Sequence, residues 1–230
     1  MKRFYAAAAA VPEGDGWRIE LDGRPVRTPK RAPLTLPTAA LAAAVAAEWD
    51  AQGDTVAPAT MPMTGLANAA IDIVLPDPQA FAAGLAAYAE SDLVCYRAEA
   101  PADLAARQAA AWDPFVAFAR TRYDAALRVT DGIAHVTQEA AAVERLAAAI
   151  RGLDAYRLAA MQPLVTIAGS LVVALALAEG AVDAETAFAA GHLDELYQAG
   201  KWGDDAEALA ALAARRAAFD AAVRFLSLLS

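Results

Sequence analysis

Residues 164–178, LVTIAGSLVVALALA, are apolar around the whole circumference of a helix, and this stretch constrains the fold more than any other. At about 1.5 Å per residue such a helix spans about 22 Å, whereas a membrane crossing needs about 20 apolar residues. Pro163 can serve as an N-terminal helix residue and Gly180 as a stop. A helix that is hydrophobic on every side needs other helices around it, so we expect it to be the buried centre of a helical domain.

The N-terminal part carries a strand pattern instead. Residues 17–21, WRIEL, alternate apolar and charged side chains, which is typical of a strand with one buried face. Asp22 and Gly23 are expected to turn the chain into a second strand over residues 24–28, where Pro25 favours an edge position. The alanine run before them is interpreted as a strand and turn rather than an export signal, because alanine makes a weak export core.

Helical patterns follow the hairpin. Thr38 is expected to cap a helix that runs to Gln52, with Trp49 as its anchor on the sheet. The breaker cluster LPDP at 75–78 marks a domain boundary, beyond which helical patterns dominate. The sequence therefore predicts an α+β fold: a small mixed α/β domain with hairpin strands over residues 1–78, then a mainly α-helical domain over residues 79–230 around one buried helix.

Charge limits the classes of partner. The formal net charge is −9 and the pI is about 4.7, which argues against nucleic acid or an anionic membrane as the main partner because both are polyanions. A single cysteine, Cys95, cannot form an internal disulfide, and with His135 and His192 alone no Cys/His metal cluster is expected. Together with the weak export core at the N-terminus, this leads us to predict a cytosolic protein with no cofactor, no metal and no stable membrane insertion.

The segment 193–203 is the candidate binding site. Asp194 and Glu195 stand beside Tyr197 and Gln198, and a predicted helix break follows at GKWG, which includes Trp202. Adjacent helix residues point about 100° apart, so the two carboxylates do not converge on one reacting atom. The alternatives are a solvated acidic face and an acidic docking site. Aromatic side chains beside polar ones favour docking.

A catalytic alternative stays open on other residues. Asp92, Tyr96, Arg97 and His135 could line a cleft between the two domains of an enzyme or small-molecule binder. Cys95 lies inside an apolar run and is predicted to be a buried small hydrophobe rather than a catalytic thiol.

Several motifs together resemble the ATP synthase assembly factor two family. In chain order they are KRFY at 2–5, LDGRPVRTP at 21–29, EWDAQ at 48–52, MPMT at 61–64, Asn68 with AID at 70–72, Asp92-Leu93 with YRA at 96–98, Gln108 with WDP at 112–114, and LDE at 193–195 with Tyr197-Gln198 and Trp202-Gly203. The series spans nearly the whole chain. Two positions depart from the family pattern: Gly65 stands where arginine is usual, and Leu196 replaces a residue that is often acidic.

The resemblance implies a non-enzymatic chaperone that binds the alpha subunit of the F-type ATP synthase catalytic head. Such a chaperone would shield the surface that alpha presents to beta until the two subunits assemble. With Met1 immediately before the first motif, the chain resembles a bacterial, cytoplasmic member, whereas eukaryotic members act in the mitochondrial matrix. Within this reading we expect Asp194, Glu195, Tyr197, Gln198 and Trp202 to contact the partner.

Overall fold

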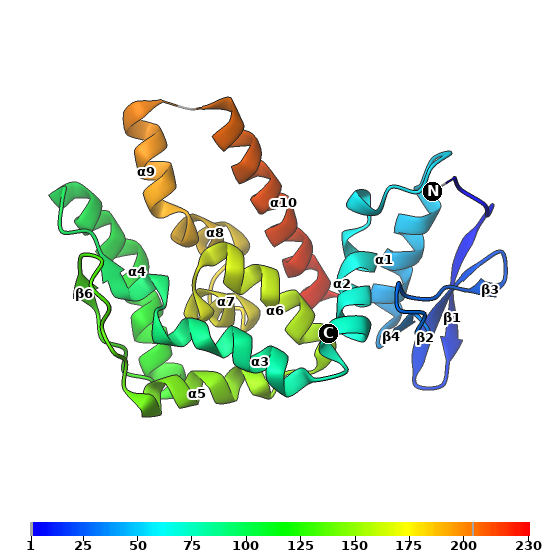
Figure 1. The fold of residues 1–230 in the computed structure, drawn as a ribbon, viewed down its shortest axis with the longest axis horizontal. Coiled ribbons are helices and arrows are strands. Elements are labelled where there is room, and N and C mark those ends of the chain that lie inside the picture. The colour runs from blue at the N-terminus through cyan, green and yellow to red at the C-terminus, as the bar shows by residue number, and fades with distance from the viewer. Residues whose placement is uncertain (1, 204) are drawn as a thin grey trace. The chain divides into compact units, whose positions relative to one another are not determined.

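The computed structural model describes residues 2–203 and 205–230 (Figure 1). The predicted α+β class is confirmed, since short strands come first and helices dominate the rest. The elements, in chain order, are β1 Ala8–Glu13, β2 Gly16–Leu21, β3 Arg24–Pro25, β4 Thr35–Leu36, α1 Ala39–Asp50, η1 Pro58–Thr60, α2 Pro62–Ala69, η2 Ala70–Val74, α3 Pro78–Ala86, η3 Ala87–Glu90, η4 Leu93–Cys95, β5 Tyr96–Arg97, α4 Ala102–Tyr123, β6 Thr130–Asp131, α5 Ala140–Arg151, α6 Ala155–Ala168, α7 Leu171–Ala178, α8 Ala184–Gly191, α9 Leu193–Trp202 and α10 Ala206–Ser227.

The chain forms two compact units. One contains residues 1–78, 154–160 and 221–230, and the other contains residues 79–153 and 161–220. The two returning segments join the first unit through its core, where Ala160 and Phe225 are fully buried beside Leu41. Tyr156 Oη also donates to Thr35 O at 2.7 Å. The predicted division into a mixed α/β domain over residues 1–78 and a helical domain over residues 79–230 stays a prediction.

The first unit is built on an antiparallel sheet in which β2 pairs with β1, β3 and β4. The predicted turn at Asp22 and Gly23 is confirmed, and both residues have the positive φ that such a tight turn requires. Helix α1 lies against β1 and β2, and Thr38 caps it by accepting from Leu41 N at 3.2 Å. Trp49 packs against the core as predicted, although it is half-buried.

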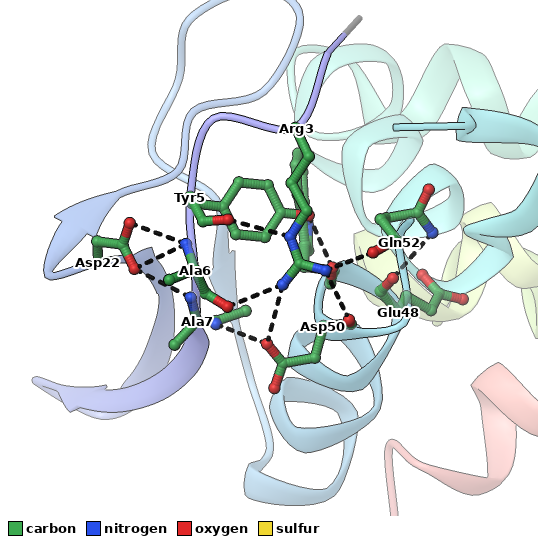
Figure 2. Close-up of polar contacts among 10 residues, drawn as sticks. Arg3, Tyr5, Ala6, Ala7, Asp22, Glu48, Asp50 and Gln52 are labelled. Carbon is green, nitrogen blue, oxygen red and sulfur yellow. Dashed lines mark hydrogen bonds and ion pairs between the residues drawn. The ribbon is translucent and has the colours of Figure 1, made fainter. Parts of the chain in front are cut away.

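The N-terminal residues are held to the end of α1 by hydrogen bonds (Figure 2). The Arg3 guanidinium donates to Tyr5 O at 3.0 Å, to Ala6 O at 2.8 Å and to Asp50 O at 3.1 Å, and also reaches Gln52 O. Tyr5 Oη donates to Trp49 O at 2.7 Å. Since Asp50 is the last residue of α1, its carbonyl is one of the groups that a helix end leaves without partners, and Arg3 supplies a donor to it.

The second unit surrounds the apolar segment 164–178, but the prediction of one continuous helix there is wrong. The chain breaks at Gly169, whose φ of 66° is left-handed, and Ser170 then caps α7 by accepting from Val173 N at 3.0 Å. Pro163 consequently lies inside α6 rather than at a helix start. The expected burial holds for residues 171–176, which are all inaccessible to solvent or nearly so, whereas Thr166 and Ala178 within the segment are exposed. In the described part of the chain, no helix combines the length and apolarity that a membrane crossing demands.

A close backbone approach fixes α8 against α6. A Cβ atom on Gly191 would lie 2.7 Å from the Ala168 Cα atom and 3.0 Å from its carbonyl oxygen, whereas a Cβ atom on Gly200 in α9 would meet nothing within 4 Å. Both glycines are helical, so intrinsic helix propensity favours alanine at each of them.

We predict that Gly191→Ala lowers the free energy of unfolding by about 1–3 kcal/mol, because the backbones have to move apart. Gly200→Ala is the matched control and should leave the free energy of unfolding unchanged or raise it by up to about 1 kcal/mol. Thermal unfolding of the two variants beside the parent measures the difference. Equal melting temperatures for the two variants would contradict the close packing of α8 on α6.

Candidate docking site

All five predicted partner-binding residues belong to helix α9, and the structure describes the side chains of four of them. Asp194, Glu195 and Tyr197 are half-buried, and Gln198 is exposed. Trp202 ends α9, but its side chain lies outside the described residues. The prediction that these residues bind a partner therefore concerns one helix, and the contacts of each side chain show which groups are free to do so.

The Asp194 carboxylate is bonded within the fold. Gln108, which is 2% exposed, donates from Nε2 to Asp194 Oδ1 at 2.7 Å, and its Oε1 accepts from Ala98 N at 2.6 Å. This chain of bonds joins α9, α4 and the segment after β5. Asp194 thus has a structural partner that the sequence pattern did not indicate.

Glu195 forms an ion pair with α10. Arg215 Nη2 donates to the two carboxylate oxygens of Glu195 at 2.5 and 2.7 Å, and the two side chains are 39% and 40% exposed. An exposed ion pair of this kind contributes about 0–1 kcal/mol to folding stability. Glu195 can therefore exchange Arg215 for a cation of the partner at little cost.

Tyr197 is the centre of a third contact. Its Oη donates to both oxygens of Asp103 at 2.9 Å, and Lys201 Nζ lies 3.4 Å from the same carboxylate. These two groups hold the pKa of Asp103 below its usual value, with the tyrosine hydrogen bond as the larger cause. The guanidinium of Arg107 lies over the Tyr197 ring, 5.4 Å from its centroid.

Beside these residues lies an apolar groove, which we call the α4–α8–α9 groove. Its volume is about 980 Å³. Apolar side chains supply most of its surface, among them Ala117 and Phe118 of α4, Val182 before α8, and Leu193 and Leu196 of α9. Trp112 Nε1 donates to Ala190 O at 2.8 Å and fixes α4 to α8 beneath it. Sequence reasoning missed the groove because it assigned the aromatic residues of α4 to the core.

A smaller hollow of about 270 Å³ lies between α9 and the start of α10. Leu196 borders both hollows and is 43% exposed, and Leu209 of α10 is 46% exposed. Leu196 is the position that departs from the family pattern toward an apolar residue. Helix α9 therefore has an exposed apolar side chain, Leu196, between the two hollows, and polar side chains such as Gln198 beside it.

Of the four residues of the catalytic alternative, Tyr96 and His135 contact each other, whereas Asp92 and Arg97 have partners outside the set. Asp92 is fully buried and accepts from Val172 N at 3.0 Å at the start of α7. Arg97 donates to Asp113 at 2.8 Å, whereas Tyr96 Oη lies 3.3 Å from His135 Nδ1.

Cys95 is fully buried, as predicted for a small hydrophobe. Burial raises the pKa of its thiol to about 12, so it carries no thiolate at neutral pH. Among the described residues, no group of three or more His, Cys, Asp or Glu side chains is placed to hold a metal ion.

Asp194→Lys is predicted to destabilise the fold by about 1–3 kcal/mol, because the buried Gln108 amide loses its acceptor. Gln198→Lys on the same helix is the control and should change stability by less than about 0.5 kcal/mol, since Gln198 is exposed. Chemical denaturation of the two variants tests the assignment. An Asp194→Lys variant as stable as the control would show that the bond to Gln108 contributes nothing.

Asp92 is expected to make folding stability depend on pH. Burial raises the pKa of its carboxyl from 3.8 to about 6, although hydrogen bonds from Ser170 and backbone N–H groups oppose the change. The folded state therefore binds more protons than the unfolded state between about pH 4 and 6, and the contribution of Asp92 to stability falls as pH rises through that window. Over the window the fall amounts to roughly 3 kcal/mol at most.

Asp92→Asn removes this titration. The free energy of unfolding of the parent minus that of the variant should decrease between pH 4 and 6 and stay constant above pH 7. Taking the difference cancels carboxyl groups such as Asp103 and Asp183, whose pKa values are lowered and which act in the opposite direction. A difference that is flat across the window would refute a raised pKa at Asp92.

The comparisons with known proteins agree with the motif resemblance. The profile described as ATP12 chaperone protein matches residues 2–120. The crystal structure of Atp12 from Paracoccus denitrificans is 44% identical in sequence with a TM-score of 0.95, and the match covers 100% of this chain and 98% of that one. An aspartate-to-lysine mutant of the P. denitrificans protein is 43% identical over the same shares, also with a TM-score of 0.95.

A third solved structure is the Atu1473 protein from Agrobacterium tumefaciens, named as a candidate chaperone. It is 39% identical with a TM-score of 0.95, and the match covers 100% of this chain and 86% of that one. The chain therefore belongs to the ATP12 chaperone family, a family of ATP synthase assembly chaperones.

Proposed function

We propose that the protein binds the alpha subunit of the F-type ATP synthase catalytic head and shields its beta-facing surface until alpha and beta assemble. Membership of the ATP12 chaperone family supports the assembly role. The observation that carries the proposal is the α4–α8–α9 groove, because a large apolar hollow bordered by polar side chains suits a protein surface that would otherwise aggregate.

The mechanism we infer is reversible binding without catalysis. A newly folded alpha subunit exposes apolar surface that is meant for beta, and covering that surface prevents aggregation. Beta then displaces the chaperone because it offers the more favourable interface, so release needs no nucleotide hydrolysis. We place the protein in the bacterial cytoplasm, where the subunits are made.

Helix α9 supplies the proposed polar contacts. Glu195, Tyr197 and Gln198 are candidates to touch the alpha subunit, Trp202 stays a candidate at the end of the helix, and Asp194 acts at least through its bond to Gln108. Glu195 is the better charged candidate because its pair with Arg215 can be exchanged at little cost, whereas Asp194 is bonded to a buried amide.

Glu195→Lys is predicted to leave the fold intact and to weaken protection of refolding alpha subunit against aggregation. Glu144→Lys is the matched control, because it makes the same change of charge and also breaks an exposed pair, with Arg151 within α5. Light scattering at low salt is the measurement, since screening weakens such contacts. Equal protection by both variants would reject acidic docking through Glu195.

Co-purification tests the wider proposal. Tagged protein expressed in a bacterium should retain the alpha subunit in the absence of beta and lose it when beta is added. Retention of other proteins without the alpha subunit would refute the proposed function.

A further inference from the structure

We propose that the α4–α8–α9 groove receives an amphipathic helix of the client, apolar face inward, and that a client carboxylate pairs with Arg107 at its edge. This inference rests on the proposed function and adds the chemistry of the segment that is bound. All the groups involved belong to the helical unit, residues 79–153 and 161–220.

The form of the groove favours a helix. Residues of α4 line it from Arg107 to Thr121, which at about 1.5 Å per residue is a length of about 21 Å, or about four helical turns. A protein helix binds such an apolar hollow through side chains on one face. Small side chains such as Ala110 and Ala117 line part of the groove and leave room for larger side chains of the client.

The charges at the edge favour a carboxylate on that helix. Three acidic groups near the groove already have cationic partners: Glu179 with Arg122 at 2.6 Å, Glu185 with Arg216 at 2.6 Å, and Asp103 with Lys201 at 3.4 Å. Arg107 is exposed, lies over the Tyr197 ring, and has no carboxylate partner among the described residues.

Arg107 is therefore a cation at this edge that no carboxylate of the described residues pairs with, although the whole chain carries −9. A client carboxylate would pair with a guanidinium whose position the Tyr197 ring already restricts, which fixes the register of the bound helix. A basic client segment fits less well beside Arg107, because it would bring a second positive charge next to an unpaired guanidinium.

A plug variant tests whether the groove is the client site. Ala117→Trp places a large side chain at an exposed groove position, and Ala106→Trp is the control because Ala106 is exposed on the same helix outside the groove. We expect Ala117→Trp to bind purified alpha subunit at least roughly tenfold more weakly than the parent, with Ala106→Trp unchanged. Thermal unfolding verifies that both variants are folded.

A second pair of variants tests the charge. Arg107→Glu should weaken alpha-subunit binding several-fold, whereas Arg107→Lys should retain most of it because the positive charge is kept. Equal binding by these two variants would overturn the carboxylate contact. Binding of alpha subunit by folded Ala117→Trp at parental affinity would overturn the groove as the client site.

A small probe separates failure of this inference from failure of the proposed function. Anilinonaphthalene sulfonate is apolar and anionic, so its fluorescence should rise with the parent and not with Ala117→Trp. If Ala117→Trp gives the same dye fluorescence as the parent, the dye does not bind in the groove, and the inference is overturned. If the parent binds the dye but not alpha subunit, the proposed function is wrong. Sedimentation gives one further outcome. A dimeric parent with a monomeric Ala117→Trp variant would assign the groove to a second copy of the chain, which would also overturn the inference.

Discussion

A buried carboxylate determines where the most apolar segment of the chain can break. Asp92 has no solvent exposure, yet its oxygens accept from Val94 N at 3.2 Å and Val172 N at 3.0 Å. A buried helix start needs partners for its first N–H groups, and Asp92 and Ser170 supply them. Leu93 N donates in turn to Gly169 O at 3.1 Å, so the break is bonded on both of its sides. Helix α7, placed in this way, contacts α4 and α8, which line the groove.

The motifs that carry the family resemblance mostly bond to one another. Pairs of motif residues include Arg3 with Gln52, Glu48 with Met63 and Thr64, Thr28 with Asp72, Arg97 with Asp113, and Gln108 with Asp194. Each pair joins segments that are distant in the sequence, within one of the two units. The motifs thus specify the fold. Membership of a motif does not by itself identify a residue that contacts the partner protein. Asp194 is the clearest case, because its carboxylate faces a buried amide of the same chain.

Local patterns predicted those features that depend on neighbouring residues. The hairpin at Asp22 and Gly23, the cap at Thr38 and the burial of 171–176 follow from turn chemistry, capping and hydrophobicity. The break at Gly169 could not be predicted in the same way, because the helix start after it depends on Asp92, about eighty residues earlier. The groove was missed for a similar reason: alanines on α4 have the same pattern whether or not another helix covers them. Phe115, 2% exposed, belongs both to the core and to the floor of the groove.

An apolar groove with paired charges at most of its edge has the properties that a holding chaperone requires. Burial of apolar surface is non-directional, so such a site holds a client without many hydrogen bonds that would have to break on release. The exposed ion pairs of Glu185 and Glu195 contribute little to stability and can rearrange around a bound segment. Arg107 alone among the cations named at this edge is without a carboxylate in the described part of the chain, so it can select the register of a client that apolar burial leaves loosely specified. Affinity from the groove and register from one cation would allow tight but reversible holding, and a partner subunit that covers the same client surface more completely would then displace the chaperone.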